Sequence, residues 1–168
     1  FAHSESNTSP TEANIKCSFS GGTLSGTKIA VVDGDIANIF VVSANNGSSV
    51  GLYLIDTDSA EVEITTQPTL DPSRSHASVT FNNTAAIELK SDWSDVLSLL
   101  DRAAVLFSFE KLGGAEACMD MAKDYAMGRY AFGRSIASFQ AIKHKLADMF
   151  IAVELARSNC YYGAWALS

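Results

Sequence analysis

The feature that most constrains this chain is a change in the spacing of its apolar residues near residue 92. Up to about residue 90, Val, Ile, Thr and Phe occur in short runs that Gly, Asn, Asp and Pro interrupt, a pattern typical of β-strands. After residue 92 the sequence has no proline, and its apolar residues recur at steps of three or four, which predicts helices. The sequence therefore predicts an α+β protein with two parts, residues 1–91 and residues 92–168.

The first part is predicted to contain seven strands, with Gly21-Gly22, Asp33-Gly34 and Asn45-Asn46-Gly47 among the turns. We expect the strands at 15–19, 24–32, 39–44, 50–56, 61–66, 76–82 and 86–90. Their spacing of about ten residues, with no helical pattern between them, indicates an antiparallel β-sandwich or barrel.

The second part is predicted to form two long antiparallel helices. We expect the first from about Asp95 to Arg129 and the second from Ser138, whose hydroxyl suits an N-cap. The expected inner faces are Leu99, Val105, Leu112, Ala115, Cys118, Ala122 and Tyr125 on the first helix, and Phe139, Ile142, Leu146, Met149, Val153, Ala156 and Cys160 on the second. Further apolar residues lie off these faces, namely Phe107, Phe150, Tyr161 and Trp165. They indicate a four-helix bundle that this chain contains only in part.

Composition disfavours several classes of function. The formal net charge of -7 argues against a nucleic-acid surface, because counterion release needs clustered Lys and Arg. No apolar run is long enough to span a membrane, and residues 1–20 lack the pattern of a signal peptide. Cys17, Cys118 and Cys160 are odd in number and widely spaced, which fits buried thiols better than disulfides or a metal site. We therefore expect a cytoplasmic protein without a metal site.

The stretch from Gly113 to Arg157 carries the most specific pattern, including the run Gly128-Arg-Tyr-Ala-Phe-Gly-Arg-Ser135. It closely resembles the C-terminal helical domain of acyl-CoA dehydrogenases. Weaker similarities reach the other half of the chain. Ser4-Glu5 resembles the Thr-Glu-Pro segment that opens the family's middle β domain, Leu24 to Lys28 resembles its second strand, and Asp71-x-Ser-Arg74 resembles its Asp-x-Thr-Arg turn.

This resemblance implies an architecture in which an α-helical N-terminal domain, a middle β domain and a C-terminal four-helix bundle assemble as tetramers. Residues 1–91 would be the middle β domain, and residues 92–168 would be the N-terminal half of the bundle domain. The N-terminal domain and the last bundle helices would lie outside the chain. We therefore expect an internal fragment of a longer protein.

The resemblance also implies oxidation of acyl-CoA thioesters to 2-enoyl-CoA, in fatty acid or lipid catabolism. In the family a glutamate removes the α proton, FAD takes up the β hydride, and electron transfer flavoprotein reoxidises the flavin. That glutamate lies beyond the second bundle helix in most members, so no catalytic residue is assigned in this chain. The expected partners are acyl-CoA, electron transfer flavoprotein and the other subunits of a homo- or heterotetramer.

Most of the implied cofactor contacts lie between the two helices. Arg129 would reach the FAD pyrophosphate of a neighbouring subunit, because a guanidinium suits phosphate oxygens, although a cation at a helix C-terminus is the simpler alternative. The residues that would flank the adenine are Phe132, Ile136, Phe139 and Gln140. Ordinary loop and bundle packing is the alternative for these four.

The remaining implied contacts are polar. Ser4 can donate a hydroxyl hydrogen bond to the cofactor. On the substrate side, Asp101 matches a family aspartate, and Arg102 is a nearby cation that could replace a family arginine.

The sequence departs from the family pattern where the flavin ring should lie. Ala30-Val31-Val32 replaces the family's Trp-Ile-Thr or Trp-Ile-Ser strand, so an aromatic ring and a hydroxyl are lost. Residues 6–11 replace a glycine-rich turn, and a backbone that approaches a phosphate is harder to build without glycine. The leading hypothesis is an FAD-dependent acyl-CoA dehydrogenase subunit. A noncatalytic, flavin-poor partner subunit is the second, and a flavin monooxygenase or another enzyme on this fold is the third.

Overall fold

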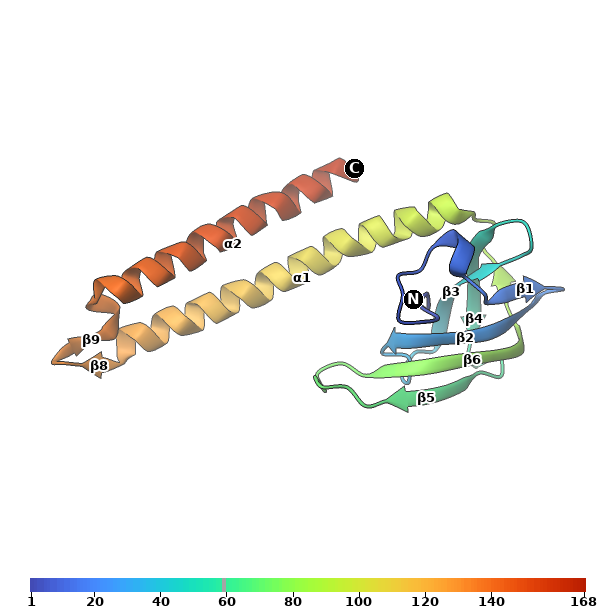
Figure 1. The fold of residues 1–168 in the computed structure, drawn as a ribbon, viewed down its shortest axis with the longest axis horizontal. Helices are drawn as coiled ribbons and strands as arrows, with labels where there is room; N and C mark the ends of the chain where they lie inside the picture. The colour runs from blue at the N-terminus through green and yellow to red at the C-terminus, as the bar shows by residue number, and fades with distance from the viewer. Residues whose placement is uncertain (59) are drawn as a thin grey trace. The chain divides into compact units, whose positions relative to one another are not determined.

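The computed structural model describes residues 1–58 and 60–168. It divides into two compact units, Phe1–Ser98 and Leu99–Ser168, which are described separately below. Figure 1 shows the strands of the first unit and the paired helices of the second.

A seven-stranded sheet makes up most of the first unit, in the order β5-β6-β2-β1-β3-β4-β7. Its elements are η1 (Glu12–Asn14), β1 (Ser18–Ser20), β2 (Thr23–Val32), β3 (Ile39–Asn45), β4 (Val50–Asp56), β5 (Glu63–Gln67), β6 (His76–Ala85) and β7 (Ile87–Glu88). The predicted α+β class is confirmed. The predicted antiparallel pairing is wrong at one place, because β1 and β3 pair in parallel at Ser18 and Asn45. The sheet is therefore mixed, and within the described residues it does not close into a barrel.

The strand predicted at 15–19 begins only at Ser18. The reason is that the backbone N–H groups of Lys16 and Cys17 donate to the Glu5 carboxylate, at 2.7 and 2.9 Å, instead of to a neighbouring strand. A side chain from the start of the chain therefore takes the place of a strand partner there.

The core of this unit comes from the alternation of buried and half-buried positions along the strands. Phe40 on β3 and Phe81 on β6 meet edge to face, with ring centroids 6.4 Å apart. Phe19 stacks on Tyr53 at 4.2 Å. The buried cluster consists of Ala2, Cys17, Leu24, Val31, Phe40, Val42, Ala44, Tyr53, Ile55, Ala77, Val79 and Phe81.

The second unit is a helical hairpin. Its elements are α1 (Trp93–Gly128), which begins in the first unit, then β8 (Tyr130–Ala131), β9 (Arg134–Ser135), η2 (Ile136–Ser138) and α2 (Gln140–Ala166). The two helices lie side by side and run in opposite directions, as predicted (Figure 1). The prediction of Ser138 as the N-cap of α2 is wrong, because Ser138 belongs to η2 and its hydroxyl donates to the Ser135 carbonyl at 2.6 Å. Phe139 is the N-cap residue.

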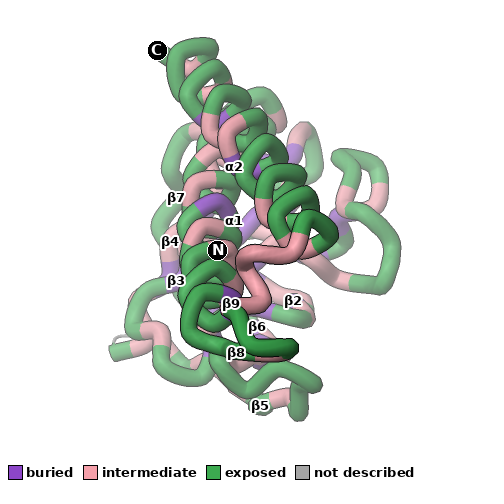
Figure 2. The backbone as a smooth tube through the Cα atoms, turned by 90° about the vertical axis from the view of Figure 1, so that its left-hand side faces the viewer, coloured by how far each residue is buried: buried purple, intermediate pink, exposed green. Residues whose placement is uncertain are grey.

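The seam between the helices is narrower than the sequence predicts. Leu112 and Ala126 on α1 and Val153 and Cys160 on α2 are buried. Five predicted inner residues are exposed instead: Ala115, Cys118, Tyr125, Met149 and Ala156. The buried positions lie 14 residues apart on α1 and seven apart on α2, which are multiples of the seven-residue repeat of a two-helix seam. Figure 2 shows most of both helices in the colour of exposed residues.

Two further observations concern the described residues as a whole. Neither α1 nor α2 combines the length and the apolar character of a membrane-spanning helix. Within residues 1–58 and 60–168, His, Cys, Asp and Glu form no group of three that could hold a metal ion.

Candidate functional site

The turn between α1 and α2 is the most unusual part of the second unit. Tyr130 pairs with Ser135 and Ala131 pairs with Arg134, so Phe132 and Gly133 form the two-residue loop of a small hairpin. Both loop residues have positive φ, 54° for Phe132 and 76° for Gly133, as a type I′ turn requires. A left-handed conformation costs an L-residue about 1–2 kcal/mol, and the Phe132 side chain is 96% exposed. A bulky aromatic that is both strained and exposed is typical of a binding site.

A second aromatic ring lies beside this turn. The Phe132 and Phe139 rings meet at 85°, with centroids 6.3 Å apart. The Arg134 guanidinium lies over the Phe139 ring, 4.1 Å from its centroid, and this cation–π contact occupies one face of the ring. Arg134 was not predicted as a site residue. The alternation of aromatic residues and arginines in the Phe-Gly-Arg run is the signal that could have indicated it.

The other predicted cofactor residues of this unit lie within the same turn. The Arg129 carbonyl accepts a hydrogen bond from the Ile136 N–H at 2.8 Å, which ties the two ends of the small hairpin together. Gln140, at the first position of α2, has its side-chain amide 3.4 Å from the His144 ring. The structure therefore brings Arg129, Phe132, Ile136, Phe139 and Gln140 together at one end of the helical hairpin.

Ser4 lies in the first unit, within an opening segment that we define as Ala2–Glu5. Its carbonyl accepts a hydrogen bond from the Ile29 N–H of β2 at 2.8 Å. Glu5, the next residue, pairs with Lys28 on β2, and their Oε1 and Nζ atoms are 2.7 Å apart. Burial raises the pKa of Glu5. Hydrogen bonds from Lys28 and from the backbone of Lys16 and Cys17 lower it by more in total, so the net shift of the pKa is downward.

Lys28 is fully buried, with 0% of its surface exposed. Its ammonium donates to Glu5 Oε1 at 2.7 Å, to the His3 carbonyl at 3.1 Å and to Ser43 Oγ at 3.2 Å, which uses all three of its protons. Burial lowers the pKa of Lys28, and the hydrogen bond to Glu5 opposes this shift. The sequence pattern indicated Ser4 in this segment but not the buried polar network around Lys28.

Cys17 lies close to this network. Burial raises the pKa of its thiol to about 12, although the Lys28 ammonium acts in the opposite direction. The thiol is therefore neutral at physiological pH and unsuited to act as a nucleophile. Cys17 and Cys160 are buried as predicted, whereas the prediction of a buried Cys118 is wrong.

The segment that resembles the family's flavin-facing strand, Ala30–Val32, is the last part of β2. The pairing of β2 with β6 shifts register between Lys28 and Val31, and Ala30 has a φ of 52°. Val31 points into the core with 3% exposure, while Ala30 and Val32 are exposed. A ring that approached this strand would meet apolar side chains without a hydroxyl.

The two predicted substrate residues lie on α1 in the second unit, and both are exposed. Arg102 lines an apolar hollow of about 450 Å³ together with Val105, Leu106, Ala164, Leu167 and Ser168. Asp101 is not among the lining residues of this hollow. The structure therefore places a cation, but not the neighbouring carboxylate, at the edge of an apolar surface.

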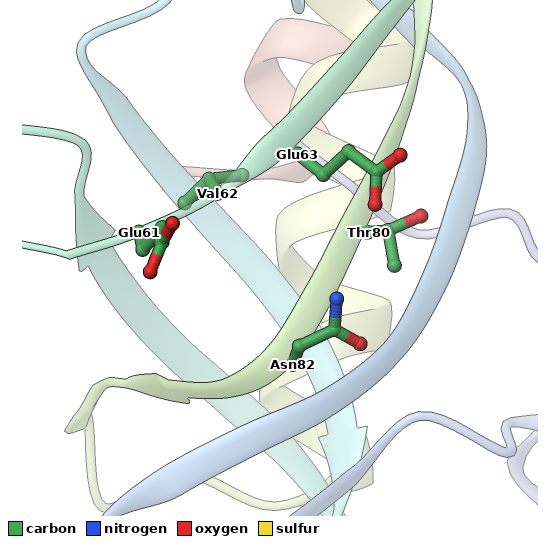
Figure 3. Close-up of a pocket in the computed structure, with 5 residues that line it drawn as sticks. All are labelled: Glu61, Val62, Glu63, Thr80 and Asn82. Atoms are coloured by element: carbon green, nitrogen blue, oxygen red, sulfur yellow. The ribbon is translucent and has the colours of Figure 1, made fainter.

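Another hollow, of about 480 Å³, lies on the first unit beside β5 and β6. Figure 3 shows the side chains that line it, which are Glu61, Val62, Glu63, Thr80 and Asn82. Two carboxylates repel an anionic ligand such as a dinucleotide or a CoA thioester. This hollow also contains none of the predicted cofactor residues.

Comparison with known proteins identifies the family. Residues 93–168 match the family described as Acyl-CoA dehydrogenase, C-terminal domain. Acyl-CoA dehydrogenase IpdE2 of Mycolicibacterium smegmatis is 37% identical over 128 residues, which are 76% of this chain and 37% of that protein. The chain thus spans less than half the length of this relative.

Two solved structures are similar in fold. A variant of the Tcur3481-Tcur3483 steroid ACAD superimposes with a TM-score of 0.78 at 27% identity, over 89% of this chain and 41% of that one. The ChsE4-ChsE5 complex from Mycobacterium tuberculosis gives a TM-score of 0.77 at 25% identity, over 96% of this chain and 44% of that one. Sequence and fold agree, and the chain belongs to the acyl-CoA dehydrogenase family.

Proposed function

We propose that this chain is part of an FAD-dependent acyl-CoA dehydrogenase subunit that converts an acyl-CoA thioester to its 2-enoyl-CoA. The observation that carries the proposal is the turn at Phe132, where an aromatic ring is 96% exposed on a backbone with a φ of 54°. Such a ring can stack on a planar ligand such as adenine. Arg129, three residues earlier in the chain, supplies a cation for a diphosphate.

The residues of the turn fit the adenine half of FAD. Phe132 and Ile136 would contact the faces of the base, and the Gln140 amide would bond to its edge. The Phe139 ring would extend the apolar surface that contacts the base, with the Arg134 guanidinium over one face of this ring. FAD supplies the hydride-accepting chemistry when bound, and the chain's own residues would anchor and orient it. Ser4 would donate a hydrogen bond to the same class of cofactor from the opening segment.

Family membership supports a proposal for the substrate and for the partners. Asp101 and Arg102 would face the acyl-CoA, with the Arg102 guanidinium beside the apolar hollow. Residues 1–91 would be the middle β domain and residues 92–168 the N-terminal half of the bundle domain. Electron transfer flavoprotein as acceptor, assembly as a tetramer, a role in lipid catabolism and a cytoplasmic location remain predictions.

A noncatalytic partner subunit is a second candidate, because one observation favours it. Ala30 and Val32 present only apolar side chains where the isoalloxazine ring should lie. A subunit of this kind would lend Arg129 and Phe132 to the flavin of a neighbouring active chain. A similar structure is itself described as a complex of two proteins, ChsE4 and ChsE5.

Titration of FAD into the assembled full-length protein tests both candidates. Arg129→Ala should weaken FAD binding roughly ten- to a hundredfold, because a charge-assisted hydrogen bond contributes about 1.5–3 kcal/mol. Phe132→Asn should also weaken binding, because asparagine keeps the positive φ but removes the ring. Lys143→Ala and Phe107→Ala, which change an exposed cation and an exposed aromatic elsewhere on the hairpin, should bind FAD like the wild type.

The number of flavins per chain, counted by absorbance, separates the two candidates. One flavin per chain in a homotetramer supports the active subunit and excludes the flavin-poor partner. The partner subunit is supported if the assembly holds fewer flavins than chains and if Arg129→Ala weakens the binding of a flavin held by a neighbouring chain. Equal FAD affinity in all four variants would contradict both.

A further inference from the structure

The opening segment, Ala2–Glu5, is fastened to two strands. The Ala2 N–H donates to the Val41 carbonyl at 2.8 Å, and the Ala2 carbonyl accepts from the Ser43 N–H of β3 at 3.2 Å. The Ser4 carbonyl accepts from the Ile29 N–H of β2 at 2.8 Å. The position of Ser4 therefore depends on how this segment is held.

The His3 side chain provides a further contact to β3. Its Nδ1 atom is 2.7 Å from Ser43 Oγ. Its ring stacks on Phe1 at 5.3 Å and on Trp93, near the start of α1, at 6.1 Å. The Nε2 atom is buried and has no hydrogen-bond partner among the described residues. Packing and one hydrogen bond thus hold the ring in place.

Proton counting shows which form of His3 fits this site. The Lys28 ammonium donates one of its protons to Ser43 Oγ, at 3.2 Å. The Ser43 hydroxyl proton is then available to the Nδ1 atom of a neutral His3. A protonated His3 has a proton on Nδ1, so the hydroxyl would have to accept from both cations and turn its own proton away from the ring. Repulsion between the two cations across Ser43 Oγ disfavours that arrangement, so the observed contacts favour the neutral ring.

The surroundings of the ring also favour its neutral form on balance. Burial and the Lys28 ammonium lower the pKa of His3, while the Glu5 carboxylate raises it by less. From β3 the ring meets the neutral Ser43, and from α1 it meets the neutral Trp93. The Asp92 carboxylate, next to Trp93, accepts hydrogen bonds from the N–H and hydroxyl of Ser94. The closed arrangement of the segment therefore favours a neutral ring.

We propose that His3 is a positioning residue that, in its neutral form, holds the Ala2–Glu5 segment on β3 through Ser43, and that its protonation releases the segment. In the closed state, the segment is held on β3 and the pKa of His3 is below its ordinary value of 6.5. The contribution of neutral His3 to holding the segment is therefore complete above pH 6.5, and it is lost as the pH falls through the lower pKa of the closed state. Release would displace Ser4. The effect on flavin binding rests on the proposed function of Ser4, whereas the release itself does not.

Amide hydrogen exchange in the full-length protein tests the release without any cofactor. The reporters are the N–H groups of Ile29 and Ser43, which donate to carbonyls of the segment. After correction for intrinsic exchange, their opening constant should rise up to about tenfold from about pH 7.5 to about pH 5.5, because each unit below the free histidine pKa of about 6.5 favours the protonated form tenfold. Unchanged protection in the wild type would overturn the proposal.

Variants of His3 separate a positioning role from simple packing. His3→Asn retains an acceptor near the Nδ1 position but cannot be protonated, so its protection should resemble that of the wild type at about pH 7.5 and stay constant at lower pH. His3→Leu should be poorly protected at both pH values. His144→Asn, on the exposed side of α2, should keep the wild-type pH dependence. The same pH dependence in His3→Asn would overturn the proposal.

Titration with FAD at both pH values tests the coupling to Ser4. Affinity should fall up to about tenfold at the lower pH in the wild type, and it should stay constant in His3→Asn. Equal FAD affinity at both pH values in the wild type would overturn the coupling. Absence of FAD binding at either pH would instead contradict the proposed function, while the exchange measurement still decides whether His3 holds the segment.

Discussion

The two units of this chain bury apolar surface to very different extents. In the β unit, Phe40 and Phe81 are 1% exposed and Ile55 and Val79 are 0% exposed, so the sheet encloses its own core. In the described helical hairpin the buried apolar residues are Leu112, Ala126, Val153 and Cys160. Large apolar residues remain exposed on both helices, including Leu106, Phe107, Phe150, Leu155, Tyr161 and Trp165.

The polar groups differ in the same way. In the β unit, the Lys28 ammonium is 0% exposed and has an acceptor for each of its protons. In the hairpin, the ion pair between Arg157 and Glu116 leaves side chains that are 38% and 31% exposed. The β unit therefore contains the partners that its buried ammonium needs. The hairpin leaves much of its apolar surface exposed on both helices.

The largest expected effect tests this contrast directly. Phe81→Ala should lower the free energy of unfolding of the β unit by about 4 kcal/mol, because it leaves a cavity in a closed core. Leu112→Ala should cost the hairpin about 2 kcal/mol, because the seam is bordered by solvent and can collapse onto the smaller side chain. Urea unfolding measures both, with Trp93 fluorescence in a Trp165→Phe background for the β unit and circular dichroism at 222 nm for the helices. Equal losses would remove the distinction between the two units.

The same contrast explains what the sequence could predict. Local patterns were sufficient for the strands and helices, because alternation on β6 and long proline-free runs on α1 reflect local backbone preferences. They could not predict the parallel pairing of β1 with β3, since that contact joins Ser18 to Asn45. They also predicted Tyr125 and Cys118 as buried, because each helix carries several apolar stripes and one seam can bury only one of them.

For the candidate site, the sequence pattern identified residues that are close in the chain. Arg129, Phe132 and Gln140 lie within one turn, so the resemblance could locate all of them. The network around Lys28 was missed, because its members are joined by contacts between residues far apart, such as Lys28 with Ser43. The strain at Phe132 was also invisible, since the backbone conformation that carries it appears only in the structure.

The buried ion pair of the β unit should give the second largest effect. Glu5→Ala should destabilise this unit by about 3 kcal/mol, because it leaves the buried Lys28 charge without its partner. Unfolding followed through Trp93 measures the loss. Glu12→Ala, which removes an exposed carboxylate from η1, should change the stability by less than about 0.5 kcal/mol. A Glu5→Leu/Lys28→Met double variant should recover part of the loss, because neither charge is then buried alone. Equal losses in Glu5→Ala and Glu12→Ala would contradict the role of the pair.

Acid should weaken the same pair. Because the folded-state pKa of Glu5 is below its ordinary value of 4.5, its contribution is complete above that value and is lost as the pH falls through the folded-state value. The β unit should therefore lose stability below about pH 4.5, and Glu5→Gln should lose less over that range. In the hairpin, the hydrogen bond to Asp120 raises the pKa of Lys123. The contribution of this ion pair to stability is therefore complete below pH 10.5, and it is lost as the pH rises through the higher pKa of the folded state.

Relief of strain at the turn should be a smaller effect of opposite sign. Phe132→Asn should raise the stability of the hairpin by about 1 kcal/mol, because relief of a left-handed phenylalanine outweighs the loss of one edge contact to Phe139. Thermal unfolding at 222 nm measures the change, and Phe107→Ala serves as the control for loss of an exposed ring. A variant that is more stable but binds FAD less well would show that the turn is maintained for binding. A lower melting temperature would show that Phe132 belongs to the packing of the hairpin.

The smallest expected effect concerns the ion pair across the hairpin seam. Arg157→Met keeps most of the side-chain length but removes the charge that contacts Glu116 on α1 and Glu154, at 3.2 Å, on α2. Because these groups are more than a third exposed on average, we expect a loss of only about 0.5 kcal/mol at low salt and less at high salt. Lys123→Met is the matched control, since it removes a similar charge whose partner, Asp120, lies on the same helix. A loss in Arg157→Met that equals the loss in Lys123→Met would show that the pair does not link the helices. A loss near that of Glu5→Ala would mean that this pair is shielded from solvent like the one in the β unit, and the contrast between the two units would then lie in their apolar cores alone.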